Sequence, residues 1–220
     1  VTVSEASRMA LIQAGVADDK IVVIRNGVDT DVFTPLPDWS PGEVTKFAYP
    51  SRILPGKAQH LAIDAVARLP RLHKRRASLH IVGANADPVY LDQIRVQSYE
   101  QPVRFSVDVP GMVPHIQDSD VVVFPTVMAE GFGFTAVEAM ACGKPVIWSD
   151  QAAIREATGG IGIPVPIGDV TAIRAAMKHL MDNPEDMMDI GRKGREYVEE
   201  NHSWAGVWER YERVIGAVMR

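Results

Sequence analysis

The feature that most constrains the fold is a series of short, almost uniformly apolar segments. They are rich in Val, Ile and Phe and show almost no alternation between polar and apolar residues. Strands that are buried on both faces of a parallel sheet have this composition, whereas half-exposed strands alternate. The sequence therefore predicts buried strands at residues 20–24, 45–49, 79–82, 103–105, 121–124, 146–148 and 163–165.

Helical patterns lie between these segments. Asp169 stands where an N-cap is expected, before an apolar run, and Gly143 with Pro145 marks the end of another helix. Strands that alternate with helices predict an α/β fold with a Rossmann-like, doubly wound parallel sheet. Ligands of such sheets bind beyond the carboxyl ends of the strands, so the loops there are the candidate sites. The helices that we expect cover residues 59–69, 89–97, 134–141, 170–182, 185–200 and 204–219.

The chain divides into four parts. Residues 26–42 contain Asn-Gly, three prolines and Gly42, a composition typical of a linker. They separate residues 1–25, which we expect to be the end of another domain and the junction with it, from a Rossmann-like body at residues 43–203. A last helix takes up residues 204–220. Because Val1 stands at what resembles a strand end, we expect a piece of a longer chain.

Composition excludes several classes of protein. Of the 220 residues, 46% are hydrophobic, which excludes a disordered or collagen-like chain. A net charge of −5 argues against general nucleic-acid binding. The single cysteine, Cys142, excludes an internal disulfide framework and a multi-cysteine metal site, and it suits a reducing compartment. We therefore expect a cytoplasmic location, no metal and no nucleic-acid partner.

The most informative loop follows the strand expected at residues 121–124. It contains Gly131 and Gly133 directly before the helix expected at residues 134–141. Two glycines at a helix start leave backbone N–H groups free to face an anion, and the helix dipole helps. Phosphate is the ligand that we expect. The alternative is a tight turn that only lets the helix pack on the sheet.

Two carboxylates flank this loop, Glu130 and Glu138. If the whole span were helical, they would lie about 12 Å apart, which is too far for the roughly 5 Å pair of a retaining glycosidase. Carboxylates accept hydrogen bonds from hydroxyls, so a sugar and a ribose on one extended ligand are suitable partners. A solvated helix position or an ion pair is the alternative for Glu138.

Other loops add weaker signals. Arg52 and Lys57 follow the strand expected at residues 45–49, and cations on such a turn can bind phosphate oxygens. Ordinary surface cations are the alternative. Gly83 follows the strand expected at residues 79–82 and permits a close approach of another backbone segment.

Together these segments resemble the carboxyl-terminal half of a retaining glycosyltransferase of the GT-B fold, family GT4. The matches run in family order over nearly the whole chain. They are the junction Val3-Ser4 with KIVVIRNGVDTDVF (20–33), the pair Arg52 and Lys57, the strand-then-glycine at 79–83, the E-x7-E motif Glu130 to Glu138, AMACGKPVI (139–147) and Asn201-His202-Ser203-Trp204.

The resemblance implies roles for individual residues. Arg52 and Lys57 would neutralise the donor diphosphate and its departure, and Glu130 would bind hydroxyls of the transferred hexose. Glu138 would bind the ribose, and Val109 falls where the base-reading loop should lie. The remaining implied donor contacts are Gly83 and the loop and helix start Gly131, Phe132, Gly133, Phe134 and Thr135.

The resemblance also implies the substrate and the partner. The donor would be a UDP-, GDP- or ADP-sugar without a further cofactor or metal, for polysaccharide or glycolipid biosynthesis. The enzyme would be a retaining hexosyltransferase of class EC 2.4. Because an amino-terminal domain would bind the acceptor, we expect the present chain to be inactive on its own. Apart from the resemblance, the basic cluster 68–76 is read first as a solvated helix end and loop, and the alternative is peripheral contact with the inner face of an anionic membrane. The departures from the family are Ser51 and Ala58 where glycine is common, Asn85 for a second glycine, and a poor match over 105–114.

Two alternatives stay open on the residues alone. Residues 131–136 fit the dinucleotide pattern G-x-G-x-x-A, with Asp150 about twenty residues further on. In a domain that binds NAD or FAD, however, this turn should follow its strand directly. The dinucleotide interpretation also leaves Arg52, Lys57 and Glu130 without a role. The second alternative is a module that binds a nucleotide sugar without catalysing its transfer.

Overall fold

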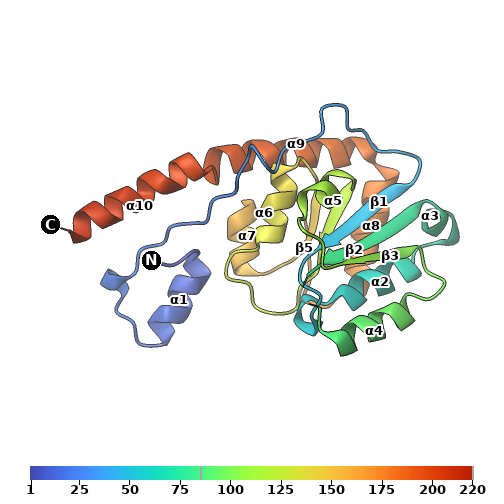
Figure 1. Ribbon diagram of the computed structural model, residues 1–220, viewed down its shortest axis with the longest axis horizontal. Coiled ribbons are helices and arrows are strands. Elements are labelled where there is room, and N and C mark those ends of the chain that lie inside the picture. The colour runs from blue at the N-terminus through green and yellow to red at the C-terminus, as the bar shows by residue number, and fades with distance from the viewer. Residues whose placement is uncertain (85, 220) are drawn as a thin grey trace.

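The structure is a computed structural model that describes residues 1–84 and 86–219, so Asn85 lies outside the described residues. Its centre is a six-stranded parallel sheet with the strand order β3-β2-β1-β4-β5-β6 (Figure 1). This is the Rossmann order, so the predicted fold class is confirmed. The strands are β1 (Thr45–Pro50), β2 (Ala77–Gly83), β3 (Val103–Val107), β4 (Val121–Phe124), β5 (Val146–Ser149) and β6 (Ile163–Val165).

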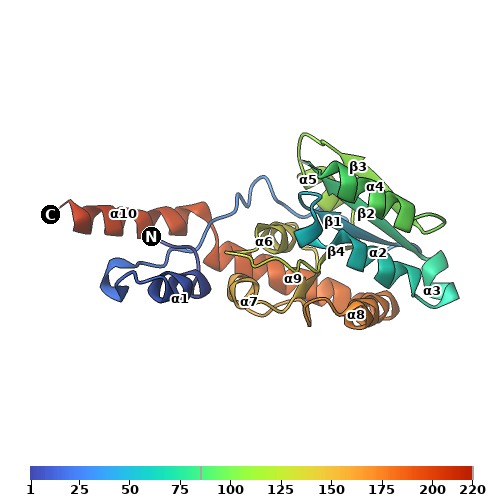
Figure 2. The same cartoon turned by 90° about the horizontal axis from the view of Figure 1, so that it is seen from below.

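Helices cover both sides of the sheet (Figure 2). The helix after β1 packs against α4 and α8, and the helix after β4 packs against α7 and α9. The helices and 3-10 turns are α1 (Glu5–Gln13), η1 (Asp18–Lys20), η2 (Pro55–Lys57), α2 (Gln59–Ala67), α3 (Arg71–Arg75), α4 (Pro88–Gln97), α5 (Val113–Gln117), α6 (Phe134–Ala141), α7 (Ala152–Thr158), α8 (Val170–Asp182), α9 (Pro184–Asn201) and α10 (Trp204–Val218).

The core lies between the sheet and these helices. Trp148 and Tyr49 are fully buried, and all four residues of β4 and of β5 are buried. This burial confirms that the runs at residues 121–124 and 146–148 are interior strands. In contrast, β3 and β6 are the edge strands and carry the exposed residues Arg104 and Pro164, so these two are not buried throughout as predicted. The helix-end signals are confirmed as well, because the Asp169 side chain accepts a hydrogen bond from the Ala172 N–H at 3.0 Å and Gly143 has φ +68°.

One predicted strand is wrong. Residues 20–24 form no strand, because Lys20 ends the turn η1 and Val23 makes only an isolated bridge with Thr2. Both bridging residues belong to the amino-terminal segment, which lies outside the sheet. An apolar run without a neighbouring strand cannot build a ladder of hydrogen bonds, so it stays extended chain.

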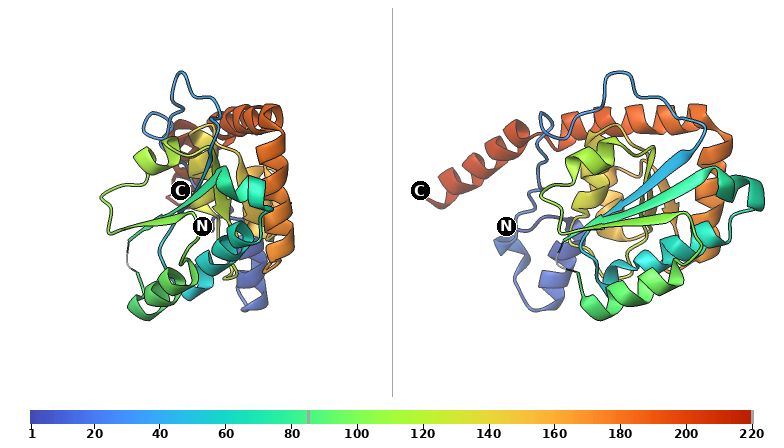
Figure 3. Two further views of the ribbon diagram at one scale, coloured as in Figure 1. Left: turned by 90° about the vertical axis from the view of Figure 1, so that its right-hand side faces the viewer. Right: turned by 45° about the vertical axis from the view of Figure 1, so that its right-hand side comes forward.

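The amino-terminal segment and α10 lie at one end of the molecule, where α10 extends away from the sheet (Figures 1 and 3). The linker reaches this end through a parallel bridge between Val28 and Ser203, in which the Val28 N–H donates to the His202 carbonyl at 2.8 Å. None of the helices in the described ranges is long and apolar enough to cross a membrane.

Candidate functional site

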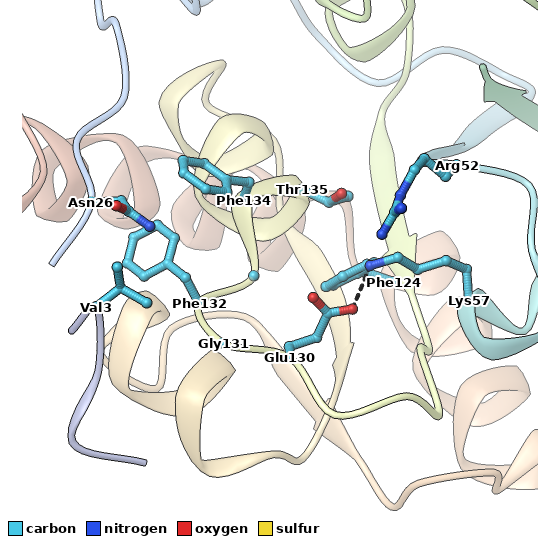
Figure 4. A pocket seen from close by; sticks show the side chains of 11 residues that line it. Val3, Asn26, Arg52, Lys57, Phe124, Glu130, Gly131, Phe132, Phe134 and Thr135 are labelled. Atoms are coloured by element: carbon cyan, nitrogen blue, oxygen red, sulfur yellow. Dashed lines mark hydrogen bonds and ion pairs between the residues drawn. The ribbon is translucent and has the colours of Figure 1, made fainter. Parts of the chain in front are cut away.

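A cavity of about 340 Å³ opens at the carboxyl ends of β1 and β4. These strands are neighbours in the sheet, so the loops that follow them meet although 73 residues separate Lys57 from Glu130 in the chain. Figure 4 shows the lining side chains. The cavity is lined by Val3, Asn26, Arg52, Lys57, Phe124, Glu130, Gly131, Phe132, Gly133, Phe134 and Thr135.

Lys57 and Glu130 form an ion pair at the base of this cavity. The Lys57 Nζ lies 2.5 Å from the Glu130 Oε1, and the two side chains are only 10% and 14% exposed. The ammonium also lies 5.2 Å from the ring centre of Phe124. The turn η2 fixes Lys57, because the Tyr49 hydroxyl donates to the Lys57 carbonyl. The one cavity lysine is therefore neutralised by a neighbouring carboxylate.

Arg52 supplies a second positive charge. Its side chain points into the cavity beside Lys57 (Figure 4), and the residue is exposed. Its backbone is held in place, since the Arg52 carbonyl accepts from the Gln59 amide at 2.8 Å and from the Ser51 hydroxyl at 3.0 Å. Among the residues that the structure describes, no carboxylate pairs with its guanidinium. The cavity thus presents a free planar cation that suits two anionic oxygens at once.

The amino end of α6 faces the same space. Gly133 is its N-cap with φ +97°, and no side chain caps the helix. A left-handed φ favours glycine, and an added Cβ would lie 3.2 Å from the Ile154 Cγ1. Within the described part of the chain, no acceptor takes the N–H groups of Gly133, Phe134 and Thr135. Free N–H groups at a helix start are a binding site for an anion.

Glu130 lies in the loop between β4 and α6, before the helix begins. Thr126, which is fully buried, donates its hydroxyl to the Glu130 Oε1 at 3.1 Å. Gln151 accepts a hydrogen bond from the Glu130 N–H at 3.0 Å. The contact with Gln151 has no sequence signal, because 21 residues separate it from Glu130. Val3, Asn26 and Phe124 were likewise missed as lining residues.

Three predicted site residues do not line this cavity. Glu138 lies on the second turn of α6, where burial raises the pKa of its carboxyl group, and no described residue donates to that carboxylate. Gly83 ends β2, and an added Cβ would lie only 1.9 Å from the Ser51 carbonyl oxygen, so a structural reason accounts for this glycine. Val109 is half-buried beyond β3. Their roles toward a ligand stay predictions.

The fold defines an α/β domain of the Rossmann-like class, and its cavity presents two cations and free N–H groups at the carboxyl ends of β1 and β4. The model of the family described as "Glycosyl transferases group 1" matches residues 45–183. This match covers more than half of the chain, which therefore belongs to the group 1 glycosyltransferases. The family assignment decides against the dinucleotide alternative, as does the loop, since β4 ends at Phe124, well before Gly131.

Curated relatives include two bacterial enzymes. A D-inositol 3-phosphate glycosyltransferase of Kineococcus radiotolerans is 31% identical over 220 aligned residues, which cover 86% of this chain and 50% of the relative. A glycogen synthase of Mycobacterium tuberculosis is 30% identical over 91% of this chain and 49% of the relative. The chain thus spans about half the length of the curated relatives that it matches.

Solved structures share the fold. HepE of Anabaena in complex with UDP and glucose superposes with a TM-score of 0.88 at 22% identity, covering 98% of this chain and 62% of that one. The carboxyl-terminal domain of a group 1 glycosyl transferase from Francisella tularensis, LpcC, gives a TM-score of 0.66 at 21% identity and covers 81% of this chain and 100% of that one. At these identities the likeness shows the fold alone. This fold is the one that was expected for the carboxyl-terminal half of a GT-B enzyme.

Proposed function

We propose that the cavity binds the diphosphate of a nucleotide-diphospho-sugar and that the complete protein transfers the sugar to an acceptor. The observation that supports this most is the meeting of Arg52, Lys57 and the uncapped start of α6 around one cavity. Two cations and a row of N–H groups suit the negative charge that develops when a diphosphate leaves. HepE, which shares the fold, is solved with UDP and with UDP-glucose.

The same placement suggests how the donor lies. Glu130 borders the cavity beside Lys57, where it would accept hydrogen bonds from hydroxyls of the transferred hexose. The N–H groups at the start of α6 would hold the distal phosphate. Glu138, further along α6, would bind the ribose, and the loops at Gly83 and Val109 would lie toward the base. The base can then be that of a UDP-, GDP- or ADP-sugar.

The chemistry that we propose is retaining transfer without a covalent enzyme intermediate. Among the cavity-lining residues Glu130 is the one carboxylate, and Lys57 holds it at 2.5 Å. A glycosidase-type mechanism instead needs two carboxyl groups about 5 Å apart. Departure of the diphosphate next to Arg52 and Lys57 would leave an oxocarbenium-like sugar, which the acceptor would attack on the same face. The complete protein would then be a retaining hexosyltransferase of class EC 2.4.

The acceptor side would lie in an amino-terminal domain. Trp204 and Trp208 on α10 are 52% and 59% exposed, and Met9 on α1 is 52% exposed. The helices that carry these residues, α1 and α10, lie at the same end of the molecule (Figure 2). We propose that residues 1–25 and α10 pack against that domain, with residues 26–42 as the linker. This chain alone should then bind donor without transferring sugar.

Membrane contact is a further part of the proposal. The basic cluster 68–76 forms the helix α3 and its flanks, and Leu72 in its middle is 72% exposed. A basic patch with an exposed apolar residue suits an anionic membrane surface, as a peripheral cytoplasmic enzyme of glycolipid or polysaccharide biosynthesis would need. Sedimentation with phosphatidylserine vesicles at low salt tests this contact, and recovery of the chain in the supernatant would contradict it.

A thermal-shift panel tests the proposed donor. UDP-glucose, GDP-mannose, ADP-glucose and NAD are added separately to the chain. We expect at least one nucleotide sugar to raise the melting temperature and NAD to leave it unchanged, because binding to the folded state alone stabilises it. Stabilisation by NAD alone, or by none of the compounds, would contradict the proposal. A second assay measures sugar transfer to water or to an acceptor with and without the amino-terminal domain. Transfer that occurs only when this domain is added would identify the chain as half of an enzyme rather than a non-catalytic binding module.

A further inference from the structure

Gln151 holds the loop that carries Glu130. It is the residue before α7, and its side chain reaches back to the loop between β4 and α6. The side-chain oxygen accepts from the Glu130 N–H at 3.0 Å. The side-chain nitrogen donates to the carbonyls of Thr126 at 3.1 Å and Met128 at 3.0 Å. One neutral amide therefore joins three backbone groups within five consecutive residues.

The other side of this loop rests on the turn η2. The carbonyl of Gly56 accepts the N–H groups of Val127 at 3.0 Å and Met128 at 2.9 Å. Gly56 directly precedes Lys57, whose ammonium pairs with Glu130. The loop is thus fixed between Gln151 and the turn that carries its ion-pair partner. Without Gln151, the contacts at Gly56 would still hold the middle of the loop but not the backbone of Glu130.

We propose that Gln151 is a positioning residue that sets the place of the Glu130 carboxylate at the sugar end of the cavity. This inference rests on the proposed function, because it assigns a role within the same donor site. Gln151 does not line the cavity, so it acts through Glu130. Its loss should weaken the contact with the sugar and spare the contacts with the diphosphate, which Arg52 and the start of α6 supply independently.

The test substitutes Gln151→Met, which keeps the length of the side chain and removes all three hydrogen bonds. Gln97→Met is the matched control. Gln97 is also half-buried and donates to the His60 carbonyl at 3.0 Å and to the Asp64 carboxylate at 2.8 Å, away from the cavity. Calorimetry measures the affinities of UDP-glucose and UDP, of GDP-mannose and GDP, and of inorganic pyrophosphate.

We expect Gln151→Met to lower the affinity for the nucleotide sugar about tenfold relative to its nucleoside diphosphate, since hydrogen bonds to a charged group contribute on that order. The affinity for pyrophosphate should stay the same or rise, because a displaced Glu130 leaves Lys57 free. Gln97→Met should change neither quantity. Gln151→Asn keeps the amide but is one methylene shorter, so it should show a smaller loss in the same direction. It also serves if Gln151→Met does not fold.

Two results would overturn the proposal. The first is an unchanged ratio of nucleotide-sugar to diphosphate affinity in both Gln151 variants. The second is an equal fall for all probes, pyrophosphate included, which would show that Gln151 only stabilises the fold. Failure of the proposed function is distinguishable, because the wild-type chain would then bind none of the nucleotides.

Discussion

The buried lysine of the cavity is paired with a carboxylate. An unpaired ammonium with a side chain only 10% exposed would lose much of its hydration, and Glu130 compensates for that loss. The same two groups have separate partners in the proposed complex, where phosphate replaces the carboxylate at Lys57 and sugar hydroxyls replace the lysine at Glu130. Glu130 and phosphate should therefore compete for Lys57.

Glu130→Gln tests this competition. We expect the affinity for inorganic pyrophosphate to rise by roughly fivefold, because Lys57 loses its charged competitor, which corresponds to about 1 kcal/mol. Calorimetric titration gives the two constants. Glu156→Gln is the control for net charge, since Glu156 pairs with Arg25 and lies outside the cavity. A pyrophosphate affinity that falls in Glu130→Gln would contradict the competition.

Lys144 is a second buried cation, and it is remote from the cavity. Its residue is 1% exposed, its ammonium has no hydrogen-bond partner among the described residues, and it lies 3.9 Å from the ring centre of Trp39. Burial lowers the pKa of Lys144 from 10.5 to about 8. Because the folded-state pKa lies below the unfolded value, the unfolded chain binds more protons between these two pH values, and stability rises with pH there.

The pH dependence of unfolding, compared between wild type and Lys144→Met, measures this effect. The free energy of unfolding of the wild type should rise relative to the variant by about 2–3 kcal/mol between pH 7 and pH 10. Urea denaturation at several pH values gives the free energies of unfolding of both proteins. The contributions of all other titrating groups cancel in the difference between wild type and variant. A difference that does not change with pH would contradict the buried, titrating lysine.

Individual side chains show what the sequence can and cannot predict. Arg52, Lys57, Glu130 and the glycine loop follow buried strands, so their meeting at one edge followed from the parallel sheet. The ion pair between Lys57 and Glu130 was not predicted, because loop geometry sets which groups touch across 73 residues. The hydrogen bonds of Gln151 were missed for the same reason.

At the scale of elements, the start of α2 departs from what its sequence favours. Ala58 has φ 59° and ψ 40°, the left-handed region in which glycine is favoured. The resemblance to the family led us to expect glycine at this position, and the backbone now gives the physical reason. Ser51, another position where the family commonly has glycine, adopts no such φ and accepts a hydrogen bond from the Gln59 side-chain amide at 3.0 Å.

Ala58→Gly should leave the free energy of unfolding within about 0.5 kcal/mol of the wild-type value. The relief of left-handed strain, about 1 kcal/mol, offsets the greater entropy of glycine in the unfolded chain. Ala62→Gly is the matched variant, since Ala62 is also fully buried but lies inside α2, and it should cost about 1 kcal/mol. Chemical denaturation compares the two. Equal losses in both variants would contradict the account.

The sheet strands and the longer helices were predicted well, and the short helices were not. The predicted bounds of α6, α8, β4 and β6 agree with the structure, because apolar runs and caps mark them. The helices α3, α5 and α7 have five to seven residues and were missed, since one or two turns carry too little periodicity. The prediction of a strand at residues 20–24 was wrong because composition alone does not show whether a neighbouring strand exists.

At the scale of the whole molecule, we propose that the chain is one half of a two-domain enzyme. It spans about half of its curated relatives, and its exposed tryptophans on α10 lie at the end where the amino-terminal segment also lies. The proposed donor cavity is bordered by that segment through Val3 and by the start of the linker through Asn26. Domain arrangement and donor binding should therefore influence each other in the complete protein.

The most direct measurement of the central claim is a calorimetric titration of nucleotide sugars into three proteins. They are the wild-type chain, the double variant Arg52→Ala/Lys57→Ala, and Lys46→Ala/Arg104→Ala, in which the same two residue types are removed from around Asp118. The account predicts that at least one nucleotide sugar binds the wild type, that the first double variant binds it at least about 100-fold more weakly, and that the second binds it as the wild type does. Equal binding by all three proteins, or no binding by the wild type, would contradict the account.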